Sequence, residues 1–361
     1  MNEDELRAAF ARHEAEAPDV DDLHASINKE VRRRRRRRTT VLSGTLAAVV
    51  ALAIAVPVYL VGRTHAAAGV PAAGQSTAPV APGRALNILL LGTDNPSRVD
   101  PTQARADTIM IIHVPVDRSR MYLVSIERDI GVEIPGHGKQ KINSAFYYGA
   151  ENGGGRAGGS ALMAQVVATL SGIPKFDAVV TVDFRAVKSV TDALGGVEVC
   201  LPRPVTVYRG VPGQDGKPPA DARTLAAGCL TRNGTDSLDL VRQRFGLPSG
   251  AYGRDRSTQR YLIGLSKKVA GLDILTDATK IVSLAHTAGV SVDTGSAGLV
   301  DLARELKNVN VDGTVPLALQ DGYTDGEGAM EGISAGGREL LAALAAGKIA
   351  EFYARHPESG L

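Results

Sequence analysis

Residues Asn87 to Val114 read NILLLGTDNPSRVDPTQARADTIMIIHV, which is two apolar runs joined by a charged loop. Each run is rich in Ile, Leu or Val, as expected of a buried β-strand. In open α/β sheets, ligands bind at the carboxyl ends of strands and in the loops that follow them. Two acids, Asp94 and Asp107, and two bases, Arg98 and Arg105, lie at this position. The stretch therefore indicates a site for a polyphosphate and a metal ion.

The composition excludes several classes of protein. The 361 residues are 44% hydrophobic, enough for the core of one large domain or two small ones. The formal net charge is only +2, so the chain lacks the strong positive field of a nucleic-acid-binding protein. With no Trp and 4% aromatic residues, it also lacks the stacking platforms that bind bases. We expect no nucleic-acid partner.

A membrane anchor is predicted near the N-terminus. Seven arginines, Arg32 to Arg38, precede an uncharged apolar run over residues 41–61. As a helix this run would extend roughly 30 Å, the thickness of a bilayer core. By the positive-inside rule, residues 1–40 are a cytoplasmic segment, residues 41–61 an uncleaved transmembrane helix, and the remainder extracytoplasmic. The alternative, a nucleic-acid-binding arginine patch, is disfavoured by its position beside the apolar run.

The remainder divides into a linker and a folded domain. Residues 62–85 are mostly Ala, Gly, Pro, Ser and Thr, a composition typical of a flexible linker. From residue 86 to 361, apolar runs alternate with helical patterns, which predicts a three-layer α/β/α domain with a central mixed sheet. The expected strands are Asn87–Leu91, Thr108–Val114, Met121–Ile126 and Ala178–Val182. The expected helices are Ser160–Leu170, Phe184–Leu194, Asp236–Arg242, Arg254–Ala270, Asp277–Thr287, Ala297–Leu306 and Ser334–Tyr353.

The two cysteines, Cys200 and Cys229, lie in the part expected outside the membrane. Because that compartment is oxidising in most bacterial envelopes, we expect a disulfide between them. Two unpaired thiols are the alternative, since sequence alone does not fix pairing. Neither cysteine has a Cys or His at ligand spacing, which argues against zinc.

Further charged residues recur at strand ends and helix starts. SIERD places Arg128 and Asp129 after a strand, and KIN places Lys141 before a probable helix. Later, LVRQRFG places Arg242 and Arg244 at the end of a helix, and YGRDRSTQR begins another helix with Arg254 and Arg256. A guanidinium suits pyrophosphate because its planar fork pairs two donors with two oxygens, and aspartates beside it suit Mg2+. The alternative for each residue alone is an ordinary surface salt bridge.

Six motifs occur in a characteristic order: NILLLGTD, RADT, SIERD, KIN, DALGGVEV (Asp192–Val199) and LVRQR. Together they closely resemble the LytR-CpsA-Psr family of envelope enzymes, over about residues 86–270. The resemblance implies a phosphotransferase that attaches a glycopolymer from a polyprenyl-pyrophosphate carrier to peptidoglycan at the outer face of the cell membrane. It also implies Mg2+ as cofactor.

The resemblance assigns roles by position. Asp94 and Asp107 would bind the metal, and the catalytic set would be these two with Arg105 and Arg128. A peptidoglycan hydroxyl would attack the phosphorus next to the glycan, with Asp94 preferred over Asp129 as proton acceptor. The pyrophosphate would be bound by seven bases, Arg98, Arg105, Arg128, Lys141, Arg242, Arg244 and Arg254. An apolar channel for the polyprenyl tail would be lined by Ala161–Leu170 or Tyr261–Leu265, although core packing is the simpler explanation of both.

Two departures from the family pattern keep other functions open. The proline usual in SIPRD is Glu127 here, and the later Arg and Gln positions hold Ser257 and Thr258, with Gln259 one place on. This puts Arg256 and Gln259 in doubt as ligands. The alternatives are a membrane-tethered polyprenyl-pyrophosphate phosphatase and a non-catalytic envelope regulator that binds lipid-linked precursors.

Two other motifs are rejected. Residues 332–336 match the G-x-S-x-G nucleophile elbow, but no strand precedes them, so Ser334 is predicted to be a helix N-cap. The glycine-rich run Gly153–Gly159 lacks the Lys and Ser or Thr that follow a phosphate-binding loop, and is predicted to be a flexible loop.

Overall fold

The computed structural model describes residues 83–94, 104–213, 216–248, 250–271, 289–295, 302, 305–306, 309–319 and 330–360. All of them belong to the second of two compact units, Thr45–Leu361. The predicted cytoplasmic segment and transmembrane helix lie outside the described residues, as do most of the linker, the helix expected at Asp277–Thr287 and most of the one at Ala297–Leu306. Within the described ranges, no helix is both long and apolar enough to cross a membrane.

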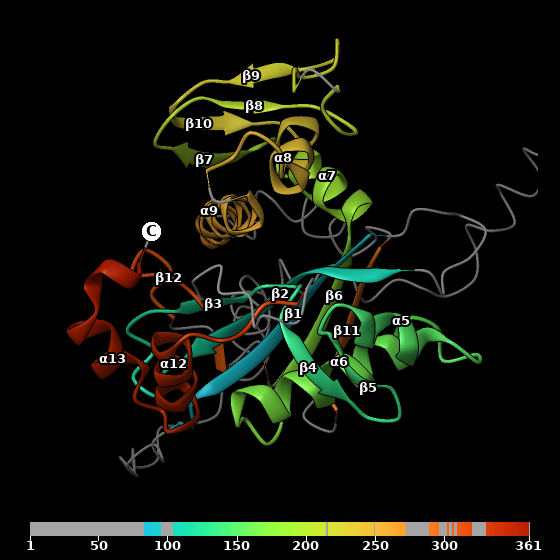
Figure 1. The fold of residues 1–361 in the computed structure, drawn as a ribbon. Coiled ribbons are helices and arrows are strands. Elements are labelled where there is room, and N and C mark those ends of the chain that lie inside the picture. The colour runs from blue at the N-terminus through green and yellow to red at the C-terminus, as the bar shows by residue number, and fades with distance from the viewer. Residues whose placement is uncertain are drawn as a thin grey trace, which may run out of the picture. The chain divides into compact units, whose positions relative to one another are not determined.

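Six strands of the described part form a mixed sheet in the order β11-β6-β1-β2-β3-β12 (Figure 1). Their bounds are β1 Leu86–Asp94, β2 Arg105–Val114, β3 Tyr122–Ile126, β6 Ala178–Asp183, β11 Val290–Asp293 and β12 Val315–Ala318. Strand β1 is antiparallel to β2 and parallel to β6, while β3 is antiparallel to β2 and parallel to β12. The four predicted strands are therefore confirmed as β1, β2, β3 and β6, and the sheet is mixed as expected.

Strand β1 is buried on both faces, which explains its nearly continuous apolar run. Leu89 and Leu91 belong to one hydrophobic cluster, and Ile88 and Leu90 belong to another. The first cluster includes residues of α6 (Gly155–Ser171), α12 (Ala335–Ala345) and α13 (Ile349–Arg355). Leu262 of helix α9 (Gly250–Ala270) packs against the second. Helices thus cover both faces of the sheet, and the α/β class is confirmed.

A second group of elements, which we call the small lobe (residues 184–242), packs on the other side of α9 (Figure 1). It contains α7 Phe184–Ala193, β7 Val197–Leu201, β8 Val205–Val207, β9 Arg223–Leu225, β10 Gly228–Arg232 and α8 Gly234–Arg242. The expected disulfide joins Cys200 and Cys229, which face each other across the β7–β10 pair. Helix α9 approaches β7 so closely that a Cβ on Gly264 would run into the Glu198 carbonyl oxygen.

Two expected segments differ in the structure. Helix α6 begins at Gly155 rather than Ser160, so most of the predicted flexible loop is helical. Its glycines allow close packing on α5 (Ser144–Ala150), since a Cβ on Gly159 would lie 2.9 Å from the Phe146 ring. The helix expected over Ser334–Tyr353 is two helices, because Gly347 adopts a left-handed φ of 68° and ends α12.

The N-cap prediction for Ser334 is confirmed, because its hydroxyl accepts a hydrogen bond from the Gly337 amide at 2.9 Å. The remaining elements are β4 Gly131–Ile134, β5 Gly138–Lys141 and the short 3-10 helix η2 Pro357–Ser359. Helix α5 follows β5 directly, as expected for the segment after Lys141.

Candidate active site

The first part of the candidate site lies where β1 ends and β2 begins. Asp94 is the last residue of β1 and pairs in register with Arg105, the first residue of β2. The Asp94 carboxylate accepts a hydrogen bond from the Arg105 amide at 3.0 Å. Burial raises the pKa of Asp94, and the negative charge of Asp107 raises it further. The two aspartates are therefore neighbours within electrostatic reach, as the sequence predicted.

The second part follows β3. Arg128 forms an ion pair with Asp107, and its Nε lies 3.6 Å from the Asp129 carboxylate. Asp129 in turn pairs with the Lys141 ammonium at 3.0 Å. Backbone contacts fix this arrangement, because the Asn143 amide donates to the Arg128 carbonyl at 3.2 Å. Alternating positive and negative groups thus run continuously from β2 to the end of β5.

Arginines from the α8–α9 region reach the same charges. Burial lowers the pKa of Arg244, and the positive charges of Arg128 and Arg254 lower it further, while Asp107 and Asp129 act in the opposite direction. Arg254, only 3% exposed, lies at the start of α9 and contacts Asp255 at 3.3 Å. Three guanidiniums therefore gather around the aspartates of β2 and the β3–β4 turn.

Several donors in this cluster are buried without a hydrogen-bond partner among the described residues. They are Nε and Nη1 of Arg254 and Nε of Arg128. A buried unsatisfied donor costs about 1–3 kcal/mol, and more when it is charged. The arrangement is therefore one that an anion with several oxygens would stabilise.

Two predicted pyrophosphate ligands stand apart from this cluster. Arg98 lies outside the described residues. Arg242 is exposed, and its guanidinium carbon lies 4.9 Å from the centroid of the Phe184 ring, a cation–π contact. The described structure thus gathers Asp94, Arg105, Asp107, Arg128, Lys141, Arg244 and Arg254, and it separates Arg242 from their ion pairs.

Two buried carboxyl groups accompany Arg254. Glu127 is 1% exposed and Asp255 is 6% exposed. Burial raises the pKa of both, and the charge of Asp255 raises that of Glu127 further, while the charge of Arg254 opposes this. The sequence identified Glu127 only as a departure from SIPRD, and Asp255 was missed. Its one local signal is its position next to Arg254.

An apolar cavity of about 70 Å³ opens beside the site, between the sheet and helices α7 and α9. Its lining includes Leu90, Val182, Phe184, Tyr261 and Leu265. The expectation that Tyr261–Leu265 lines an apolar channel agrees with this cavity. For Ala161–Leu170 the simpler explanation, core packing, is confirmed, because Met163, Val166 and Val167 are buried in the core on the opposite face of the sheet.

Comparison with known proteins identifies the family. The profile of the LytR_cpsA_psr family matches residues 64–332, well over half of the chain. The chain belongs to the LytR_cpsA_psr family. The matched range contains strands β1 and β2, the β3–β4 turn and the start of α9. The charged cluster is therefore part of the region shared with this family.

Two curated members of the family are similar to much of the chain. The cell wall biosynthesis protein LcpA of Corynebacterium glutamicum is 31% identical over 67% of the chain and 52% of its own length. The polyisoprenyl-teichoic acid--peptidoglycan teichoic acid transferase TagU of Enterococcus faecalis is 29% identical over 55% of the chain and 58% of its own length. The chain thus spans little more than half the length of these curated relatives.

The fold is shared with solved structures of the family. The structure of TagT bound to LIIa-WTA has a TM-score of 0.54 and 22% identity, covering 75% of this chain and 94% of TagT. At this identity the similarity establishes the fold. The roles of individual residues depend on the geometry described above.

Proposed function

We propose that the protein is a phosphotransferase that attaches a glycopolymer from a polyprenyl-pyrophosphate carrier to peptidoglycan at the outer face of the cell membrane. The observation that carries this proposal is the cluster of Arg128, Arg244 and Arg254, in which buried donors of Arg128 and Arg254 lack hydrogen-bond partners among the described residues. Similarity to TagU, whose name states a teichoic acid transfer to peptidoglycan, supports the substrate class. Similarity to TagT bound to LIIa-WTA supports the same class.

The residues present fit a magnesium ion shared with the substrate. Mg2+ is commonly held by one or two carboxylates together with substrate phosphates and water. Asp94 and Asp107 are such a pair, and the charge of one raises the pKa of the other. Among the described residues, no group of three or more His, Cys, Asp and Glu forms a self-sufficient metal site. When bound by Asp94 and Asp107, the ion would neutralise charge on the phosphate oxygens.

The proposed reaction is in-line transfer of one phosphoryl group. The oxygen of a peptidoglycan hydroxyl forms a bond to the phosphorus next to the glycan, and the bond from that phosphorus to the bridging oxygen breaks. Polyprenyl phosphate leaves with the electron pair, and Arg128, Arg244 and Arg254 stabilise its charge. We propose that Asp94 also accepts the hydroxyl proton, through the carboxylate oxygen that the ion leaves free.

The apolar cavity gives the polyprenyl tail a place beside the phosphates. Phe184 lines the cavity and also lies under the Arg242 guanidinium, so the apolar and cationic surfaces meet at this side chain. We assign the cavity to the isoprene units nearest the pyrophosphate, with Arg242 at its mouth. Through its contact with Phe184, Arg242 would lie close to the pyrophosphate without taking part in the ion pairs of Arg128.

We also propose that residues 41–61 anchor the chain in the membrane, with residues 1–40 in the cytoplasm. The uncharged run and the arginines before it support this topology. A single cysteine introduced at residue 25 or residue 75, in a background lacking Cys200 and Cys229, tests it in intact cells. An impermeant thiol reagent should label the variant at residue 75 alone, and labelling of residue 25 would contradict the topology.

The activity test uses the full chain in detergent micelles. A polyprenyl-pyrophosphate-linked oligosaccharide and a soluble peptidoglycan fragment are incubated with the protein and Mg2+. We expect polyprenyl phosphate and a peptidoglycan fragment carrying the glycan through a phosphodiester, both lost on addition of EDTA and restored by excess Mg2+. Free glycan phosphate in place of the adduct would instead identify a pyrophosphatase, and binding without turnover would identify a regulator.

A further inference from the structure

A second cavity, which we call the outer cavity, is lined by Arg242, the residue that lies over Phe184 of the apolar cavity. It has a volume of about 270 Å³ and is lined by residues 208–211 of the segment after β8, by residues 242–245 at and after the end of α8, and by Asp239. Two of its walls carry exposed apolar side chains, since Val211 is 70% exposed and Phe245 is 42% exposed. The outer cavity therefore combines an aromatic and aliphatic surface with arginines and amides.

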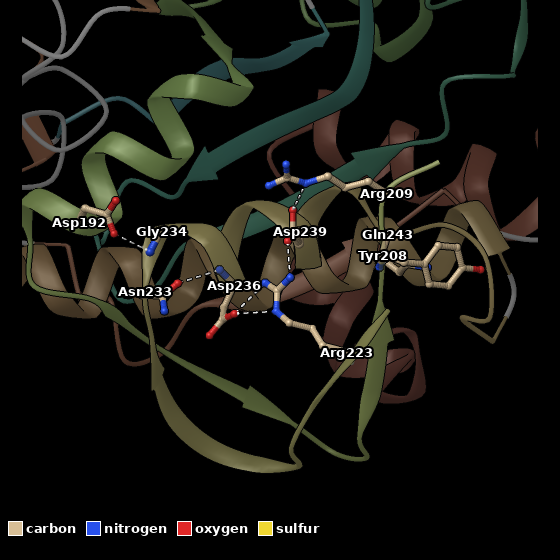
Figure 2. Close-up of polar contacts among 9 residues, drawn as sticks. All are labelled: Asp192, Tyr208, Arg209, Arg223, Asn233, Gly234, Asp236, Asp239 and Gln243. Atoms are coloured by element: carbon tan, nitrogen blue, oxygen red, sulfur yellow. Dashed lines mark hydrogen bonds and ion pairs between the residues drawn. The ribbon is translucent and has the colours of Figure 1, made fainter. Parts of the chain in front are cut away.

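Buried polar contacts hold the walls of the outer cavity in place. Gln243, 2% exposed, accepts a hydrogen bond from the Tyr208 amide at 3.1 Å and donates to the Phe245 carbonyl at 2.6 Å. It thus connects the two segments that form the cavity. Figure 2 shows this contact and the phenol ring of Tyr208 extending away from it.

Asp239 of α8 forms ion pairs with two arginines beside the outer cavity. Its carboxylate, 3% exposed, is 2.6 Å from Arg223 and 3.6 Å from Arg209 (Figure 2). Arg223 also binds Asp236 at 2.7 Å. Because the charge of Asp239 is already balanced by two arginines, it does not repel an anionic ligand from the cavity. The Arg209 side chain remains 66% exposed and free to donate additional hydrogen bonds.

Three regions of different chemistry adjoin one another along residues 241–245. Val241 lines the apolar cavity. Arg242 lies over Phe184 of that cavity and also lines the outer cavity. Arg244 interacts with Arg128 and Arg254 in the charged cluster and lines the outer cavity as well. Along residues 241–245, the apolar cavity is thus followed by the arginines and then by the outer cavity, which has aromatic and hydrogen-bonding side chains.

This order matches the parts of a lipid-linked glycan, which are tail, pyrophosphate and sugar. Pyranose rings present C–H faces that pack on aromatic side chains, and hydroxyls that accept and donate hydrogen bonds. Building on the proposed function, we infer that the outer cavity binds the sugar residues of the donor next to its pyrophosphate, with Tyr208 and Phe245 contacting the rings. The cavity would then determine which glycopolymers are accepted.

The test compares two ligands on the full chain in detergent micelles. One is sugar-free polyprenyl pyrophosphate, and the other carries a disaccharide on the same pyrophosphate. We expect the double variant Tyr208→Ala/Phe245→Ala to bind the glycosylated lipid about tenfold or more weakly, and the sugar-free lipid with unchanged affinity. Leu230→Ala is the control, because Leu230 is another exposed apolar residue of the small lobe, 44% exposed and outside the cavity lining.

The other outcomes contradict either the sugar-binding role of the outer cavity or the proposed function. Equal loss of affinity for both lipids would mean that Tyr208 and Phe245 do not recognise the sugar, and unchanged affinity for both would mean that they do not contact it; either result would overturn the inference. A raised KM for the peptidoglycan fragment with unchanged donor binding would assign the cavity to the acceptor, which also overturns it. If the wild-type chain binds neither lipid, the proposed function itself fails.

Discussion

Arg128 is ion-paired with Asp107 across the ends of two adjacent strands, and both side chains are largely buried. Arg128 follows β3 and Asp107 lies near the start of β2, so antiparallel pairing of these strands brings the two residues together. In the proposed function, this pair would supply a carboxylate for the metal and a guanidinium for the phosphate. Loss of either side chain should therefore affect the chemistry more than the fold.

Asp107→Asn should reduce transfer by at least a hundredfold while the folded content, measured by circular dichroism, stays unchanged. The substitution keeps the shape of the side chain but removes the negative charge needed by both Arg128 and Mg2+. Transfer is measured as the rate of polyprenyl phosphate release. Asp312→Asn is the control, because its side chain is 81% exposed and far along the sequence from the cluster. Equal activity of the two variants would contradict the role of Asp107.

Arg254→Lys should weaken binding of the pyrophosphate lipid about tenfold or more. Lysine keeps the positive charge but lacks the planar fork, so it cannot pair two donors with two phosphate oxygens. The measurement is the dissociation constant in detergent. Arg256→Lys, two residues further along α9, is the matched control and should bind as the wild type does. An affinity that is unchanged in Arg254→Lys would exclude a bidentate contact.

Glu127→Gln should change how stability depends on pH. Burial raises the pKa of Glu127 from 4.5 to about 7, so folding takes up a proton between these values. The free energy of unfolding of the wild type therefore falls as pH rises through that interval. The variant should lose the part of this dependence that Glu127 carries, about 3 kcal/mol between pH 4 and pH 8, and keep the part carried by Asp255.

Denaturant unfolding across this pH range measures the Glu127 effect. Glu133→Gln on β4 is the control, because Glu133 is exposed and should leave the pH dependence of the wild type intact. Parallel stability curves for wild type and Glu127→Gln would show that Glu127 does not take up the proton.

Removal of the disulfide by Cys200→Ser/Cys229→Ser should lower the free energy of unfolding by about 3 kcal/mol. The two residues are 29 positions apart, and the chain-entropy cost of such a loop is of this order. Unfolding is measured with and without reductant. Reductant should destabilise the wild type to the level of the double variant and leave the variant unchanged. A wild type that is insensitive to reductant under unfolding conditions would contradict this stabilisation.

The fold was predictable where the sequence pattern was long and strictly apolar. Strands β1, β2, β3 and β6 were identified because each is buried, whereas the strands of the small lobe were missed. Strand β8 has only three residues and β10 is largely exposed, so neither produces a hydrophobic run. Helix α6 was placed too late because its glycines indicated a turn, while in the structure they permit contact with α5.

The charged site was predictable from residue type and from position at strand ends. The sequence could not separate Arg242 from Arg244, since both occur in one short motif. Their different surroundings arise because residue 243 is extended and buried between them, so that one guanidinium lies on Phe184 and the other reaches Arg128. Asp255 was missed because its significance depends on Glu127, which is more than a hundred positions away.

Helix α9 carries both Arg254 and Tyr261, which lie in the charged cluster and at the apolar cavity respectively. Seven residues of α-helix span roughly 10 Å. Gln259 ties the helix to the carbonyls of Leu123 and Leu317, and Gly264 seats it against β7. The helix therefore fixes the distance between the charged cluster and the apolar cavity, so that under the proposed function a carrier with a different spacing between its phosphates and its apolar tail would bind more weakly.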